Sequence, residues 1–131
     1  MEQKIEASEK KGLHVVYIDD NDKAGFLMHL VIERISPGAI CRYFPTIEQA
    51  IEYIRLTIDI DHIISDLNIE HNYDGFTLYR ELKEKDILRQ ARFSILTGSI
   101  DEQVLEQGHA LGIAHILPKP ISADELKKIL I

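Results

Sequence analysis

The sequence predicts an α/β fold with an open, doubly wound sheet of five parallel strands. Five short apolar runs recur along the chain, and each is followed by a stretch whose apolar residues recur at helical spacing. Strands that alternate with helices favour a parallel sheet covered on both faces. Five strands are too few for the eight-stranded barrel that the same alternation can build.

The predicted strands are rich in β-branched residues, as buried parallel strands are. They span His14–Ile18, Ala39–Phe44, His62–Ser65, Phe93–Leu96 and Ala114–Leu117. Cys41 on the second strand is expected to be a small core residue. The six histidines show no short metal-ligand spacing and are expected at the surface or at an interface.

The predicted helices follow the strands in turn. The first spans Asp22–Ile35, ends at Ser36-Pro37-Gly38, and has one apolar face formed by Phe26, Leu27, Leu30, Val31 and Ile35. The others begin at capping signals or turns. These are Thr46 with Gln49, the Asp74-Gly75 turn after a polar loop, Ser99 with Glu102 for a helix ending near Gly108 or Gly112, and Ser122 with Glu125.

Composition places the chain among ordinary single-domain proteins. Its 131 residues are 45% apolar and 28% charged, which excludes disorder and coiled coil as whole-chain descriptions. The net charge of −7 argues against binding to nucleic acid and to anionic membranes. The single cysteine excludes an internal disulfide and a cysteine-based zinc cluster.

The first twelve residues are polar and mixed in charge, without the apolar core of a signal peptide. We expect residues 1–12 to form a flexible lead-in and residues 13–131 to form the domain. No run approaches the roughly 20 apolar residues of a membrane-spanning helix, so the expected location is the cytoplasm.

Polar side chains stand where four of the five predicted strands end. Asp19 and Asp20 follow the first strand, Asp66 the third, Thr97 the fourth and Lys119 the fifth. Open α/β sheets bind ligands at the carboxyl ends of their strands. Each residue alone has an ordinary explanation as a helix cap, turn-former or solvated loop charge, but together they predict a site.

Charge repulsion indicates what this site needs. Carboxylates about 5 Å apart repel by about 3 kcal/mol per pair at an effective dielectric constant of about 20. Lys119 supplies one compensating charge, and a hard divalent cation held by oxygens, Mg²⁺ rather than Zn²⁺, would supply the rest. Aspartate can form an acyl phosphate, and Asp66 stands apart from the Asp19-Asp20 pair, so Asp66 is the candidate nucleophile.

The ordered set of motifs at these positions resembles the receiver domain of bacterial two-component response regulators, as in the single-domain chemotaxis regulators. The similarity covers about residues 13–131 and rests on Val16–Asn21, Ile64–Asn68, Asp74-Gly75, Ile95–Gly98 and Pro118-Lys119-Pro120. It implies a flavodoxin-like (βα)₅ fold with strand order 2-1-3-4-5. It also implies a signalling phosphoacceptor that catalyses only its own phosphorylation and dephosphorylation.

The resemblance further implies a role for each site residue. Asp66 would accept the phosphoryl group, and Lys119 and Thr97 would contact it. Mg²⁺ would be bound by Asp20, Asp66, the backbone carbonyl of Asn68 and, through water, Asp19. The Lys119–Pro120 bond would be cis.

The implied partners are a sensor histidine kinase or a histidine phosphotransfer protein as donor. A downstream protein would bind the face of the fourth and fifth βα units, and there would be no direct contact with nucleic acid or membrane.

Two positions depart from the usual receiver pattern. The loop after Asp66 has no proline, and Gly75 follows Asp66 by nine residues instead of eight. Ile116 stands where an aromatic switch residue is usual, so the route of activation stays open.

Two other functions remain open at this point. One is an interaction domain of receiver fold that works without phosphorylation. The other is a Mg²⁺-dependent phosphohydrolase with an aspartyl-phosphate intermediate. Such hydrolases usually carry a second acid two residues after the nucleophile, where this chain has Asn68. The sequence leaves open whether the domain is free-standing or part of a larger protein.

Overall fold

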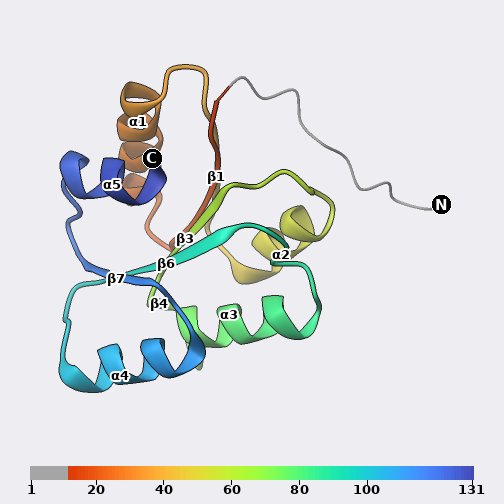
Figure 1. Cartoon of the computed structure of the whole chain (residues 1–131), viewed down its shortest axis with the longest axis vertical. Helices are drawn as coiled ribbons and strands as arrows, with labels where there is room; N and C mark the ends of the chain where they lie inside the picture. Colours follow the sequence, from red (N-terminus) through yellow and green to blue (C-terminus); the bar gives the residue numbers. More distant parts are fainter. Residues whose placement is uncertain (1–11) are drawn as a thin grey trace.

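The computed structural model describes residues 12–131, and its elements alternate between strand and helix (Figure 1). The expected lead-in over residues 1–12 lies almost wholly outside the described residues. The elements are β1 His14–Ile18, α1 Asp22–Ile35, β2 Ile40–Phe44, α2 Ile47–Arg55, β3 His62–Asp66, β4 Asn68–Glu70, β5 Tyr73–Asp74, α3 Gly75–Glu84, β6 Arg92–Thr97, α4 Glu102–Leu111, β7 His115–Pro118 and α5 Ala123–Leu130.

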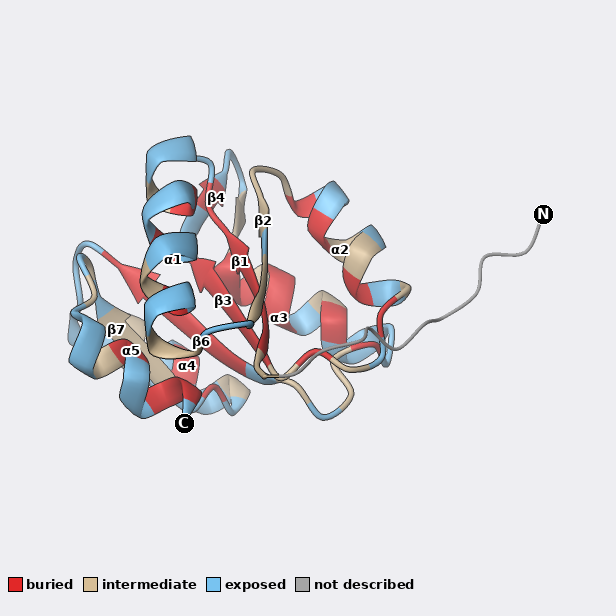
Figure 2. Ribbon diagram, turned by 90° about the horizontal axis from the view of Figure 1, so that it is seen from above, coloured by how far each residue is buried: buried red, intermediate tan, exposed pale blue. Residues whose placement is uncertain are grey.

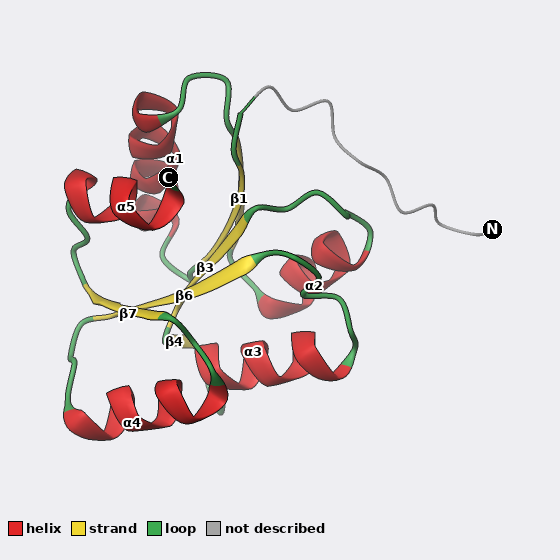
Figure 3. Cartoon of the chain, viewed as in Figure 1, coloured by secondary structure: helices red, strands yellow, loops and turns green. Residues whose placement is uncertain are grey.

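The main sheet has five strands in the order β2-β1-β3-β6-β7, and every pairing in it is parallel. This confirms the predicted α/β class and the order 2-1-3-4-5 of the five predicted strands. Helices α1 and α5 cover one face, and α2, α3 and α4 cover the other (Figure 3). None of the helices described is long and apolar enough to cross a bilayer.

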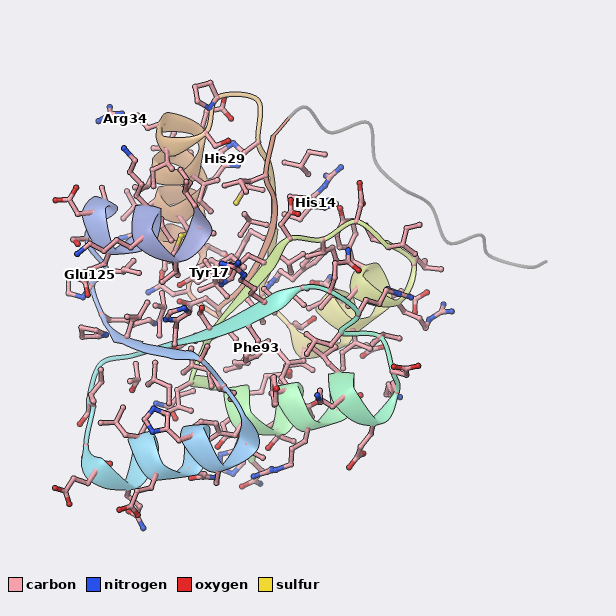
Figure 4. All side chains as sticks on the ribbon, in the orientation of Figure 1. His14, Tyr17, His29, Arg34, Phe93 and Glu125 are labelled. Carbon is pink, nitrogen blue, oxygen red and sulfur yellow. The ribbon has the colours of Figure 1, made fainter. Side chains whose placement is uncertain are left out.

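Two apolar clusters fill the spaces on either side of the sheet, because successive side chains of a strand point to opposite faces. Val15 and Tyr17 of β1 pack with α1 and α5, whereas Val16 and Ile18 pack toward α2 and α3. Figure 4 shows the same division, with Tyr17 on the α1 and α5 side and Phe93 on the α3 side. Cys41 is half-buried against the cluster that contains Val15 and Tyr17.

The predicted apolar face of α1 is correct for Val31 and Ile35, which are half-buried against the core, and wrong for the other three residues. The helix buries Gly25, Met28 and Ile32 against the sheet, while Phe26, Leu27 and Leu30 are exposed. Gly25 explains the choice, because a Cβ at this position would lie 2.5 Å from the Tyr43 ring. The glycine lets α1 approach β2 closely, and this orientation of the helix leaves Phe26, Leu27 and Leu30 exposed.

Two further local predictions are corrected. Asp101, not Ser99, caps α4, and its carboxylate accepts a hydrogen bond from the Val104 N–H at 2.9 Å. The helix ends at Leu111, with Gly112 in the left-handed conformation that favours glycine. The predicted polar loop after β3 contains the antiparallel β4–β5 pair, with Ile69 buried beneath it.

Two histidines are buried rather than exposed. His14 is fully buried, and its Nε2 lies 2.6 Å from the Tyr53 hydroxyl. His62 on β3 is 2% exposed, and its Nε2 lies 2.8 Å from Ser94 Oγ. Burial, reinforced by nearby His115, lowers the pKa of His62 to about 4, so the ring is neutral in the folded protein at neutral pH.

This burial predicts a loss of stability in acid. The unfolded chain takes up a proton at His62 near pH 6.5 and the folded chain only near pH 4, so stability falls as pH falls through this interval. We expect urea titrations to show wild type losing about 2 kcal/mol more than His62→Gln between pH 7 and pH 4.5. An equal loss in both proteins would contradict the assignment to His62.

Candidate functional site

The polar residues predicted at the strand ends gather at one edge of the sheet, because its strands are all parallel. Asp66 is the last residue of β3 and Thr97 the last of β6. Asp19 and Asp20 directly follow β1, and Lys119 directly follows β7. The carboxyl edge of the sheet therefore carries every side chain that the sequence assigned to the site.

Three carboxylates form an acidic pocket at this edge. Asp19, Asp20 and Asp66 each offer an oxygen, and these atoms lie within 4.8 Å of one another. Asp19 is fully buried and Asp66 is 7% exposed, whereas Asp20 is open to solvent. Two of the three carboxylates are thus buried, and the cluster reaches solvent at Asp20.

Lys119 bridges the two buried carboxylates. Its Nζ lies 3.1 Å from Asp19 Oδ2 and 3.1 Å from Asp66 Oδ1. The Lys119 backbone N–H donates to the Thr97 carbonyl at 2.9 Å, which ties the start of this loop to the end of β6. The Lys119–Pro120 bond is cis, as the resemblance implies.

Two tyrosines that sequence reasoning missed hold Asp19 in place. The Tyr17 hydroxyl donates to Asp19 Oδ2 at 2.5 Å, and the Tyr43 hydroxyl donates to the Asp19 carbonyl at 2.6 Å. The Asn21 N–H donates to Asp19 Oδ1 at 2.9 Å. Tyr17 could have been found from the sequence, since residues two apart on a strand share a face. Tyr43 comes from the neighbouring strand and carries no local signal.

The environment shifts the titration of the central groups. Burial raises the pKa of the Asp66 carboxyl, and the Asp19 charge adds to this, while hydrogen bonds from Lys119 and the Asn68 N–H oppose it. Burial alone would lower the pKa of Lys119, but its two carboxylate partners outweigh that effect and raise it. Burial and the hydrogen bond to Asp19 raise the pKa of Tyr17.

The backbone after Asp66 is fixed by a close approach of α3. The Gly75 N–H donates to the Leu67 carbonyl at 2.8 Å, and a Cβ at Gly75 would lie 3.0 Å from the Asp66 carbonyl oxygen. Asn68 begins β4, is exposed, and pairs with Asp74 across the hairpin. The extra residue between Asp66 and Gly75 is therefore accommodated in an ordered hairpin beside the pocket.

Thr97 and Ile116 lie on the two strands, β6 and β7, that flank α4 in the chain. Thr97 is 2% exposed, and its hydroxyl donates to the Ser99 carbonyl at 3.2 Å and accepts from the Ser99 N–H at 3.3 Å. Ile116 is half-buried under α4, where a Cβ at Gly108 would lie 2.1 Å from its Cδ1. The helix and the isoleucine thus fit closely at the position where the resemblance leads us to expect an aromatic ring.

The donor set of the pocket fits a hard divalent cation. Three carboxylates supply oxygen ligands, and neither cysteine nor histidine belongs to the cluster. Mg²⁺ is typically held by a few carboxylates while keeping several waters, and the exposed Asp20 leaves room for them.

A family model of the response regulator receiver domain matches residues 15–131. The chain belongs to this family. Receiver domains are signalling domains, and the ordered motifs that suggested the resemblance lie within the matched residues.

Solved receiver structures share the fold. Chemotaxis protein CheY4 of Vibrio cholerae is 20% identical, with a TM-score of 0.79 over 91% of this chain and 96% of that one. A receiver domain protein of Clostridium thermocellum is 20% identical, with a TM-score of 0.79 over 90% of both chains. A response regulator of Burkholderia pseudomallei, solved with a phosphorylated aspartic acid, a calcium ion and citrate, is 24% identical, with a TM-score of 0.78 over 91% of this chain and 66% of that one.

The bridging lysine predicts a pH-dependent defect in Lys119→Met. Without the ammonium group, two buried carboxylates repel each other, and we expect a loss of about 1–3 kcal/mol of unfolding free energy at pH 8. The loss should shrink toward pH 5, because the raised pKa of Asp66 allows protonation to relieve the repulsion. Urea titrations at both pH values measure this, with the exposed Lys127→Met as control. A loss that does not change with pH would refute the electrostatic explanation.

Proposed function

We propose that this receiver domain accepts a phosphoryl group on Asp66 with the help of Mg²⁺ and thereby changes its affinity for a protein partner. The observation that carries the proposal is the geometry around Asp66. Asp66 is a nearly buried carboxylate 3.1 Å from the Lys119 ammonium group. Two further carboxylates lie close enough to share a cation with it.

The donor is proposed to be a phosphohistidine of a sensor kinase or of a phosphotransfer protein. An Asp66 carboxylate oxygen attacks phosphorus, a P–O bond forms, the P–N bond breaks, and the imidazole leaves and takes up a proton. Phosphoryl transfer depends mainly on positioning and on neutralising the three equatorial oxygens. Lys119 supplies a positive charge for one of them, and Thr97 would supply a hydroxyl once it releases Ser99.

The cation would be held by Asp19, Asp20 and Asp66 with the Asn68 backbone carbonyl. Asp19 is already committed to Tyr17, Asn21 and Lys119, which suits a contact through water. Asp20 is exposed and suits a direct contact. When bound, Mg²⁺ supplies charge neutralisation between the carboxylates and the incoming phosphoryl oxygens.

Phosphorylation would act as a switch through the groups around Thr97. A phosphorylated aspartate competes for the Thr97 hydroxyl, and drawing it away from Ser99 alters the loop between β6 and α4. The face of the fourth and fifth βα units would then differ in partner affinity between the two states. One observation favours the rival function, an interaction domain that needs no phosphate: Ile116 is packed tightly against Gly108, without the usual aromatic ring.

Acetyl phosphate distinguishes these functions. With Mg²⁺ and acetyl phosphate, wild type should gain one base-labile phosphoryl group by intact mass, and Asp66→Asn should gain none. Asp86→Asn, an exposed position whose positive φ asparagine accepts, serves as matched control and should be phosphorylated normally. An unmodified wild type that also shows no Mg²⁺-dependent response to beryllofluoride would favour the interaction domain.

A further inference from the structure

Asp19 is a buried carboxylate, and each of its two oxygens accepts hydrogen bonds. It directly follows β1, which is buried along its whole length like β3 beside it (Figure 2). The Asn21 N–H donates to Asp19 Oδ1 at 2.9 Å. The other oxygen, Oδ2, has two side-chain donors, the Tyr17 hydroxyl at 2.5 Å and Lys119 Nζ at 3.1 Å. Because a charged oxygen that is buried without a donor is strongly unfavourable, the two donors of Oδ2 are energetically coupled.

The two donors differ in their freedom to move. Tyr17 is 2% exposed, and its ring belongs to the apolar cluster between the sheet and helices α1 and α5, so its hydroxyl stays at Asp19. The Lys119 side chain is 30% exposed and has a flexible aliphatic stem, and its Nζ also lies 3.1 Å from Asp66 Oδ1. The lysine can therefore exchange partners, whereas the tyrosine cannot.

Phosphorylation of Asp66, as in the proposed function, would bring a new anion to this lysine. The ammonium group is a point charge with three N–H donors, so the charged oxygens of a phosphoryl group compete with Asp19 for it. If Lys119 were the sole side-chain donor at Oδ2, its departure would strip a buried charged oxygen of that support. The unfavourable free energy of this loss would hold the lysine at Asp19 and oppose phosphorylation.

We infer that Tyr17 is a positioning residue that lowers the cost of moving Lys119 from Asp19 to the phosphoryl group. Its hydroxyl keeps Asp19 Oδ2 hydrogen-bonded when the ammonium group turns away. The destination of the lysine rests on the proposed function. The cost of releasing Lys119 from Asp19 is a property of the unphosphorylated chain, and it can be measured there.

A double-mutant cycle in the unphosphorylated protein tests this inference. Lys119→Met mimics the departure of the ammonium group, which leaves Oδ2 with Tyr17 in wild type and with neither donor in Tyr17→Phe. In urea titrations at pH 8, Lys119→Met should therefore lower the folding equilibrium constant roughly tenfold more in Tyr17→Phe than in wild type. Equal effects of Lys119→Met in both backgrounds overturn the inference.

Tyr43→Phe is the matched control for this cycle. The Tyr43 hydroxyl donates at 2.6 Å to the backbone carbonyl of Asp19, a different atom from the one that Tyr17 and Lys119 share. Tyr43→Phe should therefore be additive with Lys119→Met. A coupling as large as that of Tyr17→Phe would show a general loosening around Asp19 and would also overturn the inference.

The rate of phosphorylation by acetyl phosphate provides a second readout. Measured by intact mass at saturating Mg²⁺, so that cation affinity does not limit it, the initial rate should be roughly tenfold lower for Tyr17→Phe than for wild type. A Tyr17→Phe protein that is phosphorylated as fast as wild type overturns the inference. If wild type takes up no phosphoryl group, the proposed function fails, and the double-mutant cycle still decides whether Tyr17 sets the cost of releasing Lys119.

Discussion

One ammonium group shared by two buried carboxylates holds the site of this receiver domain together. Lys119 lies 3.1 Å from both Asp19 and Asp66, and the two acids come from different strands. The arrangement leaves excess negative charge, because a third carboxylate, the exposed Asp20, belongs to the same cluster. A pocket that is compensated only in part attracts a cation and can accommodate the positive partners that a phosphoryl group requires. The fold, the tyrosine supports and the fixed loop after β7 all serve to hold these charges close.

Three features could be predicted from the sequence: the α/β class, the strand order that the resemblance implies, and the position of the site residues at one edge of the sheet. These follow from periodicity and from the rule that parallel strands end together. The orientation of α1 could not be predicted, because both sides of this helix are apolar. The close contact between Gly25 and Tyr43 determines which side faces the sheet. Sequence reasoning also missed Tyr43 at the site, since strand-to-strand contacts leave no trace in local spacing.

Around Thr97 and Ile116, the sequence predicted the positions of the residues but not their contacts. Thr97 was predicted at the end of its strand and is found there, but its hydroxyl bonds to Ser99, two residues further along the chain. Ile116 was noted as an unusual residue for its position, and the structure adds that Gly108 makes room for it beneath α4. The residue types at positions 108 and 116 fit each other, although they are 8 positions apart in the sequence. Gly108 of α4 thus packs against an aliphatic side chain at a position where receiver domains usually carry an aromatic ring.

If Mg²⁺ relieves repulsion among the three carboxylates, it binds the folded chain and stabilises it, which a urea titration at increasing Mg²⁺ concentration measures. An ion that binds only the folded chain raises the free energy of unfolding by about 1.4 kcal/mol for each tenfold increase above its dissociation constant. Wild type should show this rise and Asp20→Asn a much smaller one, with NaCl of equal ionic strength as the reference. If wild-type stability does not respond to Mg²⁺, or if Asp20→Asn responds equally, the ion does not relieve repulsion at these carboxylates.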